Sequence, residues 1–97
     1  MYIIDSKNIN SEKSLHAELA NKFNFPSYYG KNFDALLDCL RDIADQAKLP
    51  NPIVVRFTDY FLLVKQLSCA DMQNLVTVFK DWKDEFPDLD IKITFEL

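Results

Sequence analysis

The sequence contains few of the residues from which catalytic and metal sites are usually built: its 97 residues include one glycine, one histidine and two cysteines. A single glycine leaves no glycine-rich loop to cradle a phosphate. The histidine, His16, has no obvious nucleophile partner and no metal-ligand spacing to Cys39 or Cys69. We therefore expect no enzyme activity, no metal and no cofactor, and we interpret His16 as a structural residue of the first helix.

Long apolar runs and a secretory leader are also missing. Charged residues interrupt every apolar stretch well before it reaches membrane-spanning length. The first ten residues, MYIIDSKNIN, contain no basic segment followed by a small-residue cleavage site. We therefore expect a cytoplasmic protein that does not bind a membrane. In a reducing cytosol both cysteines are expected to stay free thiols, with Cys39 on the apolar side of its helix, although their number alone would allow one pair.

Positive charge is scarce, because 11 Lys and Arg face 15 Asp and Glu and the formal net charge is −4. A protein that grips nucleic acid through its phosphates needs a basic patch, so this balance argues against a nucleic-acid partner. It permits the opposite role, in which the protein's own acids resemble a polyanion to a basic partner.

The sequence does contain an alternation of strand and helix patterns. Its length and its 48% hydrophobic content predict a single domain, residues 1–97, with a core of its own. Strands are predicted at residues 1–5, 53–57 and 91–95. The order β-α-α-β-α-α-β requires crossover connections, and it predicts an α/β fold with a three-stranded parallel sheet packed by helices.

Capping residues and prolines set the expected helix boundaries. The first helix begins at Asn10 or Ser11 and is stopped by Pro26, and the second runs from an Asn32 cap to about Ala47. A short helix is expected between residues 59 and 67. The last helix begins at an S-x-x-D capping box, residues 68–71, and ends before residue 87. Its predicted apolar stripe consists of Met72, Leu75, Val76, Phe79, Trp82 and Phe86.

The second helix is predicted to have an apolar face and an acidic face. At about 100° per residue, the acids fall within about 80° of one another and Leu37 lies at their border, as a candidate apolar contact for a partner. Like charges at this spacing repel by ~0.2–0.5 kcal/mol per pair, and Arg41 can shield part of this repulsion. Because the repulsion costs helix stability, its presence suggests that the acids form a binding face. The alternative is that the acids form an ordinary solvated surface with no binding role. The apolar face consists of Leu36, Cys39, Leu40 and Ile43, and the acidic stripe of Asp34, Asp38, Asp42 and Asp45.

The segment around the start of this helix resembles a known family. Residues 28–40, YYGKNFDALLDCL, are similar to the signature segment of the barstar family, intracellular inhibitors of the ribonuclease barnase. The YYG turn, the asparagine cap and the D-A-L-x-D-C-L pattern all match, and looser similarity extends through SLHAEL, KQL, VFKDWK and ITF. The resemblance implies three parallel strands packed on one side by helices. It also implies an inhibitor that plugs the active site of a basic, barnase-like ribonuclease, one-to-one.

The resemblance also implies a role for individual residues. Asp38 would enter the phosphate-binding site of the ribonuclease and meet its arginines and catalytic histidine, mimicking an RNA phosphate, while Asp34 would pair with basic groups beside it. The turn before the helix would form the entry segment, and an acid of the last helix would add a contact. The residues implied to bind the partner are Tyr28, Gly30, Asn32, Asp34, Leu37, Asp38 and Asp81.

Some positions depart from the family pattern. Leu37 and Ile43 stand where tryptophans are common. Arg41 occupies a position that can approach the partner, where a basic enzyme would repel its positive charge. These departures suggest a related ribonuclease, with a differently shaped rim, in place of barnase itself. The alternative is an immunity-type interaction module of the same fold that neutralises a non-ribonuclease toxin or another basic protein.

Overall fold

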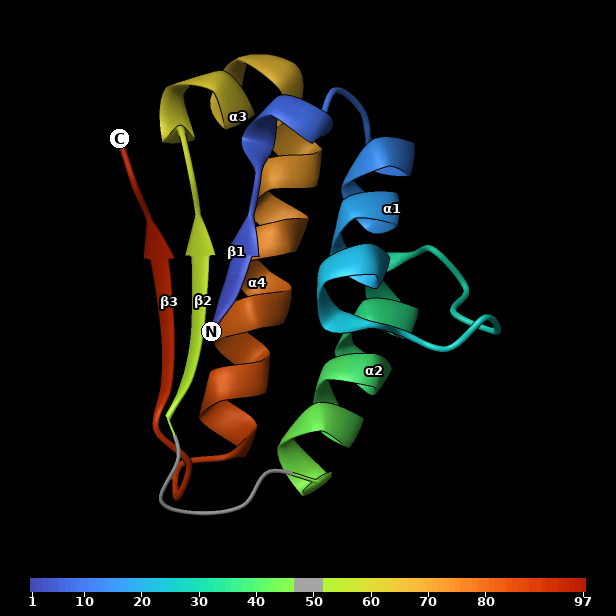
Figure 1. Ribbon diagram of the computed structural model, residues 1–97, viewed down its shortest axis with the longest axis vertical. Coiled ribbons are helices and arrows are strands. Elements are labelled where there is room, and N and C mark those ends of the chain that lie inside the picture. Colours follow the sequence, from blue (N-terminus) through green and yellow to red (C-terminus); the bar gives the residue numbers. More distant parts are fainter. Residues whose placement is uncertain (47–51) are drawn as a thin grey trace.

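The computed structural model describes residues 1–46 and 52–97, in which one three-stranded sheet lies beside four α-helices (Figure 1). The strands are β1 (Tyr2–Ile4), β2 (Ile53–Phe57) and β3 (Ile91–Phe95), and a 3-10 turn, η1 (Ser6–Asn8), follows β1. The helices are α1 (Glu12–Phe23), α2 (Phe33–Gln46), α3 (Tyr60–Gln66) and α4 (Cys69–Glu85). The predicted order of elements is confirmed, and the second and third strands have the predicted bounds.

The sheet has the order β1-β2-β3 and is parallel throughout. Its register pairs Ile4 with Phe57 and Phe57 with Phe95. Alternate residues of each strand point to one buried face, while Ile3 and Lys92, among others, remain exposed on the opposite side. In Figure 1, α4 runs beside the strands with α1 and α2 next to it, and α3 crosses the end of the sheet at which the strands finish. The prediction of a parallel three-stranded sheet packed by helices is thus confirmed.

The core joins β2 to α4 through aromatic rings. Phe57 packs edge-on against Phe79 with ring centroids 5.5 Å apart, and Phe79 packs in the same way against Trp82 at 6.0 Å. The predicted apolar stripe of α4 was wrong at Val76, whose side chain is 45% exposed, because the buried row runs through Val78 instead. That row has the i, i+3, i+4, i+7 spacing of a helix face that packs on a sheet, and it consists of Leu75, Val78, Phe79 and Trp82.

The first helix begins as predicted and ends at Phe23, before Pro26. Ser11 is its N-cap, and a reciprocal pair of contacts with Ser14 forms a capping box. At the other end Asn24 adopts the left-handed conformation, with φ 56° and ψ 49°, and its N–H donates to the carbonyl of Ala20. The helix therefore ends at an asparagine C-cap before the chain reaches Pro26.

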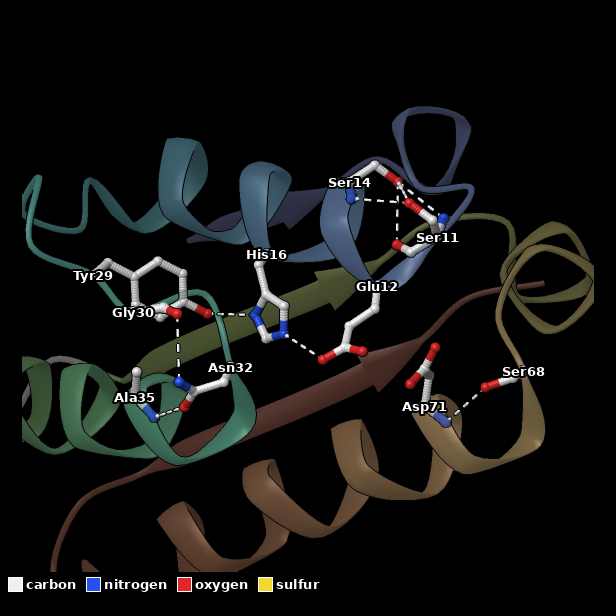
Figure 2. A network of polar contacts seen from close by, with 10 residues as sticks. All are labelled: Ser11, Glu12, Ser14, His16, Tyr29, Gly30, Asn32, Ala35, Ser68 and Asp71. Atoms are coloured by element: carbon white, nitrogen blue, oxygen red, sulfur yellow. Dashed lines mark hydrogen bonds and ion pairs between the residues drawn. The ribbon is translucent and has the colours of Figure 1, made fainter.

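The capping box predicted at the start of α4 is only half formed. Ser68 Oγ accepts the N–H of Asp71 at 3.1 Å (Figure 2), but in the described part of the chain Asp71 returns no contact to the backbone of Ser68. An aspartate side chain is one carbon shorter than the glutamate that usually closes such a box. The expected last residue of α2, Ala47, lies outside the described residues.

Candidate partner-binding face

Asn32 fixes the start of α2, as the sequence predicted. Its Oδ1 accepts the N–H of Ala35 at 2.7 Å, and its carbonyl accepts the N–H of Leu36 at 2.9 Å. The Nδ2 of the same side chain donates to the carbonyl of Gly30 at 3.4 Å, so one residue caps the helix and holds the turn before it (Figure 2).

Close contact favours glycine at position 30, whose backbone conformation is an ordinary one. The residue in the left-handed region is its neighbour Lys31, with φ 55°. A Cβ atom at position 30 would lie 3.3 Å from both the Ala35 Cβ and the Asn32 Nδ2. The glycine therefore lets the turn lie directly on the first turn of α2, which keeps the entry segment close to the acids of the helix.

The two tyrosines of the turn have opposite orientations. Tyr29 is 7% exposed, packs at a tilt against the ring of Phe25 and hydrogen-bonds through its hydroxyl to Nδ1 of His16. Tyr28 is 79% exposed and is available to a partner. The anchoring role of Tyr29 was missed at the level of sequence, because its contact with α1 requires the packed fold.

His16 lies fully buried behind this turn, as expected of a structural residue. Its ring packs edge-on against Phe33 at 4.9 Å, and its Nε2 lies 3.5 Å from a carboxylate oxygen of Glu12 (Figure 2). Desolvation lowers the pKa of His16 below its ordinary 6.5, although the carboxylates of Glu12 and Asp71 oppose the shift. The imidazole is thus held neutral near physiological pH.

The acidic stripe predicted on α2 is exposed along its length, and Leu37 lies half-buried at its border, as the helical arithmetic expected. The apolar face differs at one position, because Ala44 is buried where Ile43 was expected and Ile43 is only partly covered. The exposed acids are Asp34, Asp38, Asp42 and Asp45.

Arg41 connects this stripe to α4, and its connection to Glu85 was not predicted. Its Nη1 donates to Asp38 Oδ1 at 2.9 Å, while its Nε and Nη2 donate to the two carboxylate oxygens of Glu85 at 2.8 and 2.7 Å. These hydrogen bonds raise the pKa of Arg41 and lower that of Glu85. The i, i+3 spacing of Asp38 and Arg41 was visible in the sequence, but the contact with Glu85 depends on how α2 packs on α4.

Asp81 is exposed on α4, one helical turn before Glu85. Because Glu85 is tied to α2 through Arg41, this acidic side of α4 adjoins the stripe of α2. The turn residues Tyr28, Gly30 and Asn32 lead directly into the first turn of the same stripe. The predicted partner-binding residues thus belong to one turn, the helix it enters and the helix packed beside it.

The thiols do not supply a reactive group to this face. Cys39 is buried, and desolvation together with the carboxylates of Asp42 and Asp38 raises the pKa of its thiol. Cys69 is exposed at the start of α4, and both cysteines are free, as predicted. Within residues 1–46 and 52–97 no group of three or more His, Cys, Asp and Glu side chains is placed to hold a metal ion. None of the helices described there has the length and apolar character needed to cross a membrane.

Comparison with known proteins gives two matches. The family model described as Barstar (barnase inhibitor) matches residues 1–97. The protein named Putative ribonuclease inhibitor YrdF, from Bacillus subtilis (strain 168), is 37% identical over 89 residues, which cover 87% of this chain and 90% of that protein. A match of that extent includes the turn and the acidic helix described above.

Proposed function

Because this chain belongs to the barstar family, we propose that it is a cytoplasmic protein inhibitor that binds a barnase-like ribonuclease one-to-one and occludes its active site. The name of the Bacillus subtilis relative, a putative ribonuclease inhibitor, supports the same role. In this proposal the protein has no catalytic activity of its own. The observation that carries it is the family match over the whole chain, combined with exposed carboxylates at Asp34 and Asp38 on a well-anchored helix.

The chemistry of a ribonuclease site explains why such a helix fits it. The site holds phosphates, so it is basic and partly desolvated, and carboxylates can take the positions of phosphate groups. Side chains on a rigid helix enter it without the ordering cost of a flexible ligand. Complementary charge also speeds the encounter of the two proteins.

The face offers apolar contact beside the charge. Tyr28 extends from the turn, and Leu37 borders the stripe between Asp34 and Asp38. We propose that Tyr28 packs on the rim of the enzyme, that Gly30 and Asn32 add backbone or amide contacts, and that Asp81 reaches a basic group from α4. Asp38 is the proposed phosphate mimic at the centre.

A titration in an RNA-cleavage assay tests the proposal. The target enzyme would be a small basic ribonuclease encoded by a gene beside that of this protein, with barnase as a second target. We expect cleavage by the neighbouring enzyme to fall in proportion to added inhibitor and to stop at one equivalent, and we expect the inhibitor alone to cleave nothing. Undiminished cleavage at a large excess would contradict ribonuclease inhibition. Binding to a different basic toxin would then favour the immunity-type module.

A further inference from the structure

Arg41 joins the two helices of the proposed face through three hydrogen bonds. Two of them go to Glu85 on α4 and one goes to Asp38 on α2. We infer that Arg41, held by Glu85, is a positioning residue that fixes the Asp38 carboxylate in the orientation that the target ribonuclease binds. This inference rests on the proposed function and adds Arg41 and Glu85 to the residues on which it depends.

The geometry leaves Asp38 oriented but open. Arg41 uses only Oδ1, and a carboxylate can accept about four hydrogen bonds through its two oxygens. The Asp38 side chain is 72% exposed, whereas those of Arg41 and Glu85 are 41% and 40% exposed. An arginine of the partner can therefore bind the remaining lone pairs without displacing Arg41.

The anchor is a bidentate pair between two planar groups. A guanidinium that meets a carboxylate through two parallel hydrogen bonds has its position set more tightly than a single contact could set it. A lysine at position 41 would keep the charge but could not form this fork. The pair thus restricts the Asp38 rotamer already in the free protein, so less conformational entropy is lost on binding. This preorganisation should appear as slower dissociation.

Arg41 also has an electrostatic cost for a protein whose partner is basic. Two carboxylates and one guanidinium give the three groups a net charge of −1, which would be −2 without the arginine charge. Arg41 should therefore slow the encounter with a basic enzyme while it prolongs the complex. Positioning by Arg41 therefore affects the dissociation rate, whereas its charge affects the association rate, and the two roles can be measured separately.

The kinetics of binding to the target ribonuclease test the inference. Arg41→Lys should leave association nearly unchanged and speed dissociation by ~2–10-fold, the range expected when one ordered side chain is released. Arg41→Gln and Glu85→Gln should both speed dissociation, while association rises for the first and falls for the second. Combining Arg41→Gln with Glu85→Gln should add little further to the dissociation rate, because the two residues act as one unit.

Lys80→Gln is the matched control, since Lys80 is an exposed cation of α4 whose partner is Asp84 and which does not contact Asp38. It should raise association slightly and leave dissociation unchanged. The inference would be overturned if the Arg41→Lys variant dissociated at the wild-type rate. It would also be overturned if the effects of Arg41→Gln and Glu85→Gln on the dissociation rate were fully additive in the double variant.

A second measurement needs no ribonuclease. Three-bond Hα–Hβ couplings of Asp38 in the free protein should report one dominant rotamer in the wild type and averaging in Arg41→Gln. Averaged couplings in the wild type would overturn the positioning role. If the wild type bound no ribonuclease, the proposed function would fail, and the couplings would still decide whether the Arg41–Glu85 pair orients Asp38.

Discussion

The hydroxyl of Tyr29 hydrogen-bonds to Nδ1 of the buried His16, and this contact ties the turn before α2 to the inner side of α1 (Figure 2). The neighbouring Tyr28 and Gly30 belong to the proposed binding face, so the imidazole supports that face from within. Its protonation state therefore bears on the stability of the protein.

We predict that stability falls as the pH drops below about 6.5, the ordinary pKa of histidine. Burial lowers the pKa of His16 in the folded protein, so below this pH the unfolded chain binds more protons than the folded one. The free energy of unfolding must then decrease with falling pH, by up to ~1.4 kcal/mol per pH unit. Urea unfolding between about pH 8 and about pH 5 would measure this slope.

His16→Gln is the control, because it removes the titrating group and should flatten the slope in this pH window. Glu85 and Glu96 also titrate differently in the folded protein, since hydrogen bonds from Arg41 and Arg56 lower their pKa values. Their contribution is present above the ordinary glutamate value of 4.5 and is lost only as the pH falls below it, outside the window. An equal slope in His16→Gln would contradict the assignment.

The cap of α2 gives a prediction that separates folding from binding. Asn32→Ala removes the acceptor for the Ala35 N–H and should destabilise the protein by ~0.5–2 kcal/mol. Asn32→Asp keeps an acceptor at the N-terminus of the helix, where negative charge is favoured. It loses only the long 3.4 Å donation from Nδ2 to the Gly30 carbonyl, so it should stay close to the wild-type melting temperature. Weaker ribonuclease binding by Asn32→Asp at unchanged stability would support a partner contact through the amide. A melting temperature as low as that of Asn32→Ala would contradict the capping role.

The two cysteines should differ in their effect on stability and agree in their redox state. Cys39→Ala removes a buried thiol from the core and should cost about 1 kcal/mol, whereas Cys69→Ala should be nearly neutral at its exposed site. Inhibition should survive the double replacement, because neither thiol lies on the proposed face. Intact mass measured without reductant tests the redox state. A disulfide between residues 39 and 69 in freshly isolated protein would contradict it.

The sequence was sufficient wherever structure depends on neighbours along the chain. The strand at residues 53–57, the Asn32 cap and the acidic stripe follow from local patterns of two to four residues. The Tyr29–His16 and Arg41–Glu85 contacts do not, because each joins segments that meet only after the helices pack. The choice between Val76 and Val78 likewise depends on how α4 is rotated against the sheet, and both residues are equally apolar.

The acidic stripe yields the prediction that separates a phosphate mimic from a solvated surface. If Asp38 enters the enzyme's phosphate site, Asp38→Ala leaves basic groups of the partner buried and unpaired. Binding should then weaken by at least ~2–5 kcal/mol, mostly through faster dissociation, a range for which barnase and its inhibitor are themselves a reference case. The melting temperature should change little, since the lost contact with Arg41 opposes the relief of repulsion from neighbouring acids.

Two other acids of the stripe serve as internal comparisons. Asp34→Ala should also speed dissociation, though less cleanly, because Asp34 lies in the first turn of α2 and supports the helix through its dipole. Asp45→Ala removes the same charge beyond the signature segment, residues 28–40, so it should alter mainly the association rate. Dissociation rates and melting temperatures measured together for all three variants decide the matter. Small and equal effects on binding would mean that the acids contribute only through the summed negative charge of the surface and make no specific contact. In that case Asp38 would not be the phosphate mimic, even if the protein inhibits a ribonuclease.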